Sequence, residues 1–188
     1  MKVVYPREQW CVACNLCEVA CMTEHSKTKD PLKMYLTERP RPIPRTRVEY
    51  RPPLSISTMC RHCAEAECVE ACKNGTLTRN EKTGRIELDQ DKCLGCWMCI
   101  MACPYGAISQ FTLLEKATAE AVGSKLSGQA DGGLKPPSPN TDKGQSSLTG
   151  FTMDGRAVAN KCDLCPDREV PACVTVCPNR ALVFEDRG

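Results

Sequence analysis

The sequence predicts an α+β protein built from two small units, one nested inside the other, with short helices and small antiparallel hairpins. Three observations predict this fold class. First, the 16 cysteines of the 188-residue chain fall into four blocks of four. Second, only 20 residues separate the second block from the third, whereas 38 and 58 residues separate the other neighbouring blocks. Third, the chain is 41% hydrophobic with its cysteines counted and 5% aromatic, so the apolar core of each unit must be small.

The four cysteine blocks share the same beginning and end. Each opens on C-x2-C and closes on C-x3-C, and the gap between these halves is x2 in blocks one and three, x4 in block two and x7 in block four. The blocks are Cys11, Cys14, Cys17 and Cys21; Cys60, Cys63, Cys68 and Cys72; Cys93, Cys96, Cys99 and Cys103; and Cys162, Cys165, Cys173 and Cys177. Bacterial ferredoxins hold [4Fe–4S] clusters with the run C-x2-C-x2-C-x3-C. Sixteen thiolates, at four per cluster, therefore predict four [4Fe–4S] clusters with all sixteen cysteines as iron ligands.

The spacers and a rule of ferredoxin ligation predict which cysteines share a cluster. The short spacer pairs blocks two and three in an inner ferredoxin-like unit, and blocks one and four would close an outer unit around it. In two-cluster ferredoxins the fourth cysteine of a run ligates the other cluster. The predicted ligand sets are Cys11, Cys14, Cys17 and Cys177; Cys162, Cys165, Cys173 and Cys21; Cys60, Cys63, Cys68 and Cys103; and Cys93, Cys96, Cys99 and Cys72.

This pairing divides the chain into four parts. They are an outer dicluster unit (1–34 with 155–188), an Arg/Pro-rich connection (35–54), an inner dicluster unit (55–112) and a Gly/Ser/Pro-rich insertion (113–154). In residues 123–150, half of the 28 positions are Gly, Ser or Pro, a composition that cannot bury enough surface to order itself. This stretch is either a plain linker or a docking arm for a partner.

Local patterns predict a few short elements. Thr76–Thr78 and Arg85–Leu88 are expected to be strands joined by a turn. Further strands are expected at 107–113 and 180–185, and a brief helix at the alanine-rich residues 115–122.

The stretch 38–53 holds five arginines and five prolines, so an extended backbone is expected there, with Arg45–Tyr50 as an edge strand. Its arginines would either dock an anionic partner or offset cluster charge.

Clustered cysteines can also form disulfides or bind zinc. Disulfide scaffolds are typical of secreted chains, but the N-terminal MKVVYPREQWC has no apolar signal region, so a reducing cytoplasm is the expected location. Zinc sites favour two C-x2-C pairs separated by a loop, whereas blocks one and three place three cysteines within seven residues. A zinc-stabilised interaction module stays the remote alternative, and block four with its x7 gap suits it best.

Composition and motifs restrict the function further. The formal charge of +2 omits the clusters, each of which carries about −2 with its thiolates, so the loaded chain is acidic and nucleic acid is not expected as a partner. No run of eighteen apolar residues exists, so direct membrane insertion is not expected. Nothing resembles a phosphate loop, a nucleophile with its base or a flavin fingerprint, so no catalytic residue is predicted and the chain is not expected to be an enzyme.

Three side chains close to the cysteines are candidates for an accessory role. His25 and His62 could ligate a metal or donate to a cluster sulfur, and because the cysteine count is already complete, a role beside the ligands or on the surface is expected. Trp97 lies between Cys96 and Cys99, where it could shield a cluster from water or simply fill space.

The four blocks, in this order, resemble the four-cluster iron–sulfur subunits of the formate dehydrogenase and dimethyl sulfoxide reductase class. A closer resemblance is to the electron-transfer subunit that serves nickel carbon monoxide dehydrogenase. It is carried by CVACNLCEVAC (11–21), HSKTKD (25–30), PRPIPRTRVE (40–49), CRHC (60–63), CLGCWMCIMACPYGAI (93–108) and KCDLC (161–165). The Gly/Ser/Pro-rich insertion departs from that family.

The resemblance implies an electron-transfer subunit. It would relay single electrons between a catalytic oxidoreductase subunit, with carbon monoxide dehydrogenase as the first expectation, and a redox acceptor protein or flavin subunit. The alternative is the same role for a tungsten or molybdenum pterin enzyme, such as an aldehyde or formate oxidoreductase, or for a hydrogenase.

Overall fold

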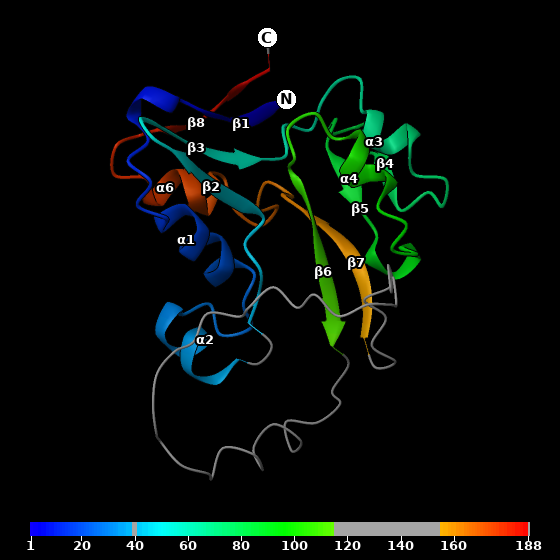
Figure 1. The fold of residues 1–188 in the computed structure, drawn as a ribbon, viewed down its shortest axis with the longest axis horizontal. Coiled ribbons are helices and arrows are strands. Elements are labelled where there is room, and N and C mark those ends of the chain that lie inside the picture. The colour runs from blue at the N-terminus through cyan, green and yellow to red at the C-terminus, as the bar shows by residue number, and fades with distance from the viewer. Residues whose placement is uncertain (39–40, 115–154, 188) are drawn as a thin grey trace, which may run out of the picture.

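The structure is a computed structural model that describes residues 1–38, 41–114 and 155–187. Within these residues, short helices accompany four separate two-stranded antiparallel sheets (Figure 1). In chain order the elements are β1 (Lys2–Pro6), η1 (Glu8–Trp10), α1 (Leu16–Glu24), α2 (Pro31–Thr37), β2 (Thr46–Arg51), β3 (Leu54–Met59), α3 (Glu67–Glu70), β4 (Leu77–Arg79), β5 (Ile86–Leu88), η2 (Gln90–Lys92), α4 (Met98–Ala102), β6 (Ile108–Leu114), β7 (Gly155–Lys161), α6 (Ala172–Val176) and β8 (Leu182–Asp186).

The first lobe brings the two ends of the chain together. Strand β1 pairs antiparallel with β8, with Val4 opposite Phe184. Helix α1, which carries the end of block one, contacts α6 of block four (Figure 1). Val3, Val4, Leu164 and Leu182 are buried there among Cys17, Cys60, Cys162 and Cys173. The first core is therefore small, and cysteines make up a large part of it.

The second lobe contains blocks two and three. Helix α3 contacts α4, and β4 pairs with β5 in the hairpin that joins the two blocks (Figure 1). Leu77 and Ile86 of this hairpin are buried with Cys93 and Cys99 in a second core. Each lobe thus combines cysteine blocks with short helices and at least one two-stranded sheet.

Strands β6 and β7 connect the lobes. Strand β6 follows block three, and β7, which pairs with it, leads directly into block four. Val158 and Ala159 of β7 belong to the second core, whereas Cys162 and Leu164, only a few residues later, belong to the first.

The hairpin β2–β3 packs against the first lobe through Met59. Residues 54 and 55, where the predicted connection ends and the predicted inner unit begins, both lie in β3.

The short-range expectations agree with the structure to within two residues. The α+β class is confirmed, as are strands at β2, β4, β5, β6 and β8. The expected helix at 115–122 and the Gly/Ser/Pro-rich stretch 123–150 lie outside the described residues. Among the helices that the structure describes, none is long and apolar enough to cross a membrane.

Candidate iron–sulfur sites

The four blocks share one local backbone conformation. In each C-x2-C the residue before the second cysteine has a positive φ: 53° at Ala13, 47° at His62, 69° at Gly95 and 63° at Leu164. A non-glycine residue in this left-handed region costs about 1–2 kcal/mol, so three blocks hold a strained residue at the same point. Because this conformational cost recurs at equivalent positions, we infer that the turn is needed to place the first two cysteines of each block.

Three of the four predicted ligand sets each line a single pocket. Group A (Cys11, Cys14, Cys17 and Cys177) lines a pocket with Trp10, Val48 and Leu182. Group C (Cys60, Cys63, Cys68 and Cys103) lines a second pocket with Tyr105 and Ile108. Group D (Cys93, Cys96, Cys99 and Cys72) lines a third, beside Leu77 and Trp97. In every case three cysteines come from one block and the fourth from the block that shares its lobe.

The remaining set, group B (Cys162, Cys165, Cys173 and Cys21), is also brought together. Burial is the main cause that raises the pKa of Cys173, and the nearby thiolates of Cys162, Cys21 and Cys165 raise it further. The pKa of Cys165 is likewise raised by burial first and then by acidic neighbours that include Cys21. Cys21 therefore lies with the cysteines of block four, although it belongs to block one.

The groups follow one another through the molecule. Cys173 of group B lies close enough to Cys17 of group A for the charge of Cys17 to raise its pKa. The charge of Cys60 in group C raises the pKa of Cys162 in group B in the same way. Groups C and D share the second lobe, where α3 and α4 each lead to a cysteine of the other group. The order along the protein is A, B, C and D, and the step from B to C crosses between the lobes.

Backbone amides donate to the sulfur atoms in each group. The N–H of Ala181 donates to Cys177 Sγ at 3.2 Å and that of Ala107 to Cys103 Sγ at 3.4 Å, each from four residues further on. The other bonds of this kind run from Arg45 to Cys21, from His62 to Cys60, from Leu164 to Cys162 and from Ala159 to Cys93, at 3.2 to 3.4 Å. Such bonds to ligand sulfurs are among the factors that set iron–sulfur reduction potentials.

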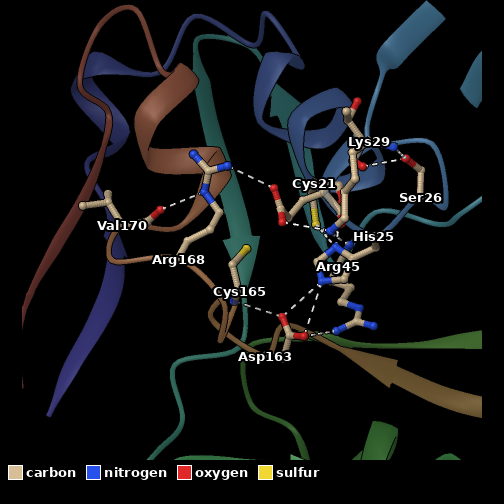
Figure 2. Close-up of polar contacts among 11 residues, drawn as sticks. Cys21, His25, Ser26, Lys29, Arg45, Asp163, Cys165, Arg168 and Val170 are labelled. Carbon is tan, nitrogen blue, oxygen red and sulfur yellow. Dashed lines mark hydrogen bonds and ion pairs between the residues drawn. The ribbon is translucent and has the colours of Figure 1, made fainter. Parts of the chain in front are cut away.

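His25 lies between Cys21 of group B and Asp163 of block four (Figure 2). Its Nδ1 is 2.7 Å from the carbonyl oxygen of Cys21 and 3.7 Å from Cys21 Sγ, and its Nε2 is 3.2 Å from Asp163 Oδ1. Burial lowers the pKa of His25, but the bonds to Asp163 and Cys21 outweigh it and raise the pKa to about 9. Both ring nitrogens therefore donate, and neither offers a lone pair to a metal, although His25, Asp163 and Cys165 lie close enough together to hold one.

Asp163 is the hub of this polar network. Its carboxylate also pairs with the Arg45 guanidinium, and it accepts from the N–H of Cys165 at 3.1 Å. Burial raises the pKa of Asp163, but His25 and Arg45 together hold it well below its usual range. Arg45 of the Arg/Pro-rich stretch is thus an internal ion-pair partner rather than part of an exposed docking patch.

The loop of block four is tied to α1 by a second polar contact. Arg168 in the x7 gap pairs with Glu24 at 3.1 Å, and Glu24 also pairs with Lys29 at 3.0 Å. Arg168 additionally donates to the carbonyl oxygen of Val170 at 3.3 Å (Figure 2).

The two remaining accessory candidates have distinct surroundings. His62 is fully buried, and its Nδ1 accepts from the N–H of Ile86 at 3.0 Å. Trp97 is half-buried and lines the pocket of group D.

Sequence reasoning missed several polar residues beside the cysteines, among them Ser57, whose hydroxyl lies 3.5 Å from Cys17 Sγ, and Asp163. A charged residue inside a C-x2-C pair was the available signal for Asp163.

The donor groups fit [4Fe–4S] clusters. Each group offers four sulfur atoms, and none of the sixteen cysteines is in a disulfide. Burial, followed by the charge of neighbouring cysteines, raises the pKa of Cys68 to about 11, and burial raises that of Cys162 to about 12. These thiols stay protonated at neutral pH unless a metal replaces the proton, and iron does so on ligation.

The fold and these sites define a ferredoxin-like iron–sulfur protein, and comparisons with known proteins agree. A family model described as a 4Fe-4S dicluster domain matches residues 53–121. Electron transport protein HydN of Escherichia coli K12 is 33% identical over 179 residues, which cover 95% of this chain and 84% of that protein.

Two further relatives from the same strain are components of larger enzymes by name. Hydrogenase-4 component A is 33% identical over 175 residues, covering 92% of this chain and 77% of that protein. Formate hydrogenlyase subunit 2 is 32% identical over 186 residues, covering 94% of this chain and 77% of that protein. The chain belongs to this family of [4Fe–4S] electron-transfer proteins. The prediction that it is a non-catalytic subunit is confirmed by these relatives, and the zinc alternative loses its support.

Proposed function

We propose that the chain holds four [4Fe–4S] clusters, at groups A to D, and relays single electrons between the catalytic subunit of a hydrogenase or formate-converting complex and a redox acceptor. Each cluster, when bound, supplies a site that accepts and donates one electron. The observation that carries the proposal is the gathering of sixteen cysteines into four groups of four, each drawn from two blocks.

The arrangement of the lobes supports the nested organisation. The helices of blocks one and four contact each other in the first lobe, and those of blocks two and three contact each other in the second. This pairing accounts for the crossed ligand sets, because the last cysteine of each block lies with the first three cysteines of the block that it is paired with. The outer unit, the inner unit and the two connecting stretches, with the limits predicted from the sequence, remain part of the proposal.

Exposed surface at both ends of the series supports entry and exit of electrons there. Cys14 of group A and Cys96 of group D are exposed, whereas every other cysteine is at least half-buried. Trp10 and Val12 are exposed beside group A, and Leu94 and Met101 beside group D. Apolar surface at both ends suits contact with two different proteins, a catalytic subunit and an acceptor protein or flavin subunit.

The relatives guide the choice of the catalytic partner. Their names include a hydrogenase component and a formate hydrogenlyase subunit, which favours the hydrogenase or formate alternative over carbon monoxide dehydrogenase. The assignment of carbon monoxide dehydrogenase as the catalytic partner is supported by the sequence resemblance alone. A cytoplasmic location, where thiols stay reduced, suits either partner.

Anaerobic purification of the full chain from its native host, alone and with its bound partners, tests the proposal. The chain alone should contain about sixteen irons per copy and absorb broadly in the visible range. In the complex, nickel with reduction of this chain by hydrogen would identify a hydrogenase, and molybdenum or tungsten with reduction by formate would identify a pterin enzyme. Reduction by carbon monoxide alone would restore the first expectation. A colourless chain with zinc and little iron would refute electron transfer.

A further inference from the structure

One lysine is buried at the junction between the lobes, where Cys162 of the first lobe meets Ile86 of the second. The Lys161 side chain is 2% exposed. Its Nζ donates to the carbonyl oxygen of Ile86 at 2.5 Å and to that of Cys162 at 2.9 Å. Among the described residues no carboxylate forms an ion pair with Lys161.

An ammonium buried in this way needs a negative charge nearby. Moving an ammonium ion out of water costs several kcal/mol unless an opposite charge compensates it, and two backbone carbonyls supply only partial charge. The nearest acidic residue in the sequence is Asp163, but its carboxylate is already engaged by Arg45 and His25. Three further acidic residues, Glu87, Asp89 and Asp91, line the same cavity as Lys161, but no described carboxylate is in ion-pair contact with its ammonium.

Cysteines of groups B and C both lie close to this lysine. Cys162 of group B is its neighbour in the chain and accepts one of its hydrogen bonds. The charge of Lys161 also acts on Cys60 and Cys68 of group C. Burial raises the pKa of both thiols, and the positive charge of Lys161 opposes that rise. An oxidised cluster with four thiolates carries about −2, and so a cluster at either group would balance the buried ammonium.

We propose that Lys161 is a fixed positive charge that raises the reduction potentials of the two clusters at groups B and C and holds electrons at the crossing between the lobes. This inference rests on the proposed cluster binding at these groups. A positive charge stabilises the reduced form of a cluster, which is more negative by one unit, and burial keeps the interaction strong because solvent cannot screen it. Groups A and D are the far ends of the series and should feel this charge less.

The chain offers a matched control for this lysine. Lys92 directly precedes the first cysteine of block three, as Lys161 precedes the first cysteine of block four. Lys92 is 63% exposed and pairs with Asp89 at 3.0 Å. The two lysines occupy equivalent places in their blocks but differ in burial and in ion pairing.

The test is a potentiometric titration of the full chain, purified anaerobically, with the clusters followed by electron paramagnetic resonance. Lys161→Gln keeps a hydrogen-bond donor and removes the charge, Lys161→Arg keeps the charge, and Lys92→Gln is the control. Two of the four midpoint potentials should fall in Lys161→Gln, whereas Lys161→Arg and Lys92→Gln should resemble the wild type. Unchanged potentials in Lys161→Gln, or an equal fall at all four clusters, would overturn the inference.

Iron content separates this result from loss of the clusters. If Lys161→Gln loses iron while Lys161→Arg keeps about sixteen irons, the charge itself is required to retain the clusters, and the electrostatic role stands. If both variants lose iron, the shape of lysine matters rather than its charge, and the inference fails. A wild-type chain without iron would instead refute the proposed function.

Discussion

Gly95, in the first turn of block three, lies very close to the backbone of β7. Its φ is +69°, and a Cβ atom at this position would lie 2.7 Å from the carbonyl oxygen of Ala157 in β7. Real Cβ atoms do not come this close to a backbone oxygen, so a side chain here would push β7 away from block three. The N–H of Ala159, on the same strand, donates to Cys93 Sγ, so the displacement would disturb group D.

Gly95→Ala should therefore destabilise the loaded protein more than a glycine substitution that meets no neighbour. Gly106 is the matched control, because its φ is +57° and no atom lies within 4 Å of an added Cβ. Gly106→Ala should cost only the left-handed backbone conformation, about 1–2 kcal/mol. The measurement is the urea concentration at which half of the visible cluster absorption is lost. Equal midpoints for the two variants would contradict the close-approach argument.

His62 provides a test of how the stability of the folded protein depends on pH. Burial, followed by the charges of Lys161 and Arg85, lowers the pKa of His62 to about 3, against 6.5 for the free side chain. Below pH 6.5 the unfolded chain takes up a proton at this residue and the folded chain does not. Its contribution to stability is therefore complete above pH 6.5 and is lost progressively as the pH falls toward 3, at about 1.4 kcal/mol per pH unit.

His62→Asn should reduce this pH dependence. Asparagine can still accept from the N–H of Ile86 but does not titrate. Between pH 6.5 and pH 5, the wild type should lose about 2 kcal/mol more than the variant. Urea midpoints measured at several pH values, after a fixed incubation time, give the comparison. Parallel losses in the two proteins would show that His62 does not remain neutral in the folded state.

The roles of single residues were only partly predictable from the sequence. The sixteen cysteines stand out by spacing, and Trp97 by its place within block three. The ionisation of His25 could not be predicted, because its partner Asp163 is 138 residues away. The burial of Lys161 was equally hidden, since Lys92 has the same local context and is exposed. Burial and pairing depend on which segments meet in space, and local sequence does not contain that information.

Short strands and turns were easier to predict than the pairing of strands. The hairpin β4–β5 lies between two close blocks, and a turn joins its strands. Strand β1 was not predicted. It gains its order from β8, at the opposite end of the sequence, and Val3 and Val4 are buried once that pairing forms. Likewise, β7 becomes a strand by pairing with β6.

The helix α4 and its end at Cys103 provide a test of crossed ligation. Cys103 belongs to block three, but it lines the pocket of Cys60, Cys63 and Cys68. Cys103→Ala should therefore damage the cluster of group C, with a loss of about four irons or conversion to a smaller cluster. Its electron paramagnetic resonance spectrum should match that of Cys68→Ala, a variant in block two.

A variant in the same block supplies the control for this comparison. Cys99→Ala should instead match Cys72→Ala, because these two cysteines line the pocket of group D. If Cys103→Ala gave the same spectral loss as Cys99→Ala, ligation would follow the blocks and the crossed sets would be wrong.

In the part of the chain that the structure describes, cysteines belong to both of the small cores. Of the nine buried residues of the first core, Cys17, Cys60, Cys162 and Cys173 are cysteines. The sheets have two strands each, and isolated two-stranded sheets are marginal in water. The described helices are also short: the longest of them, α1, has nine residues, and helices of this length need tertiary contacts to persist. Metal clusters would supply the links that such elements lack.

Removal of the clusters should therefore unfold both lobes. The thiols of each group would be left facing one another without iron, and the pockets that they line would have nothing to fill them. Treatment with an iron chelator under anaerobic reducing conditions should abolish the cooperative thermal transition and most of the far-ultraviolet circular dichroism, and iron with sulfide should restore both. An apo chain that kept its cooperative transition would show that β1–β8, β2–β3 and β6–β7 hold the fold without metal. In that case the cysteines would serve electron transfer alone, and the lobes would be preformed sites that clusters enter after folding.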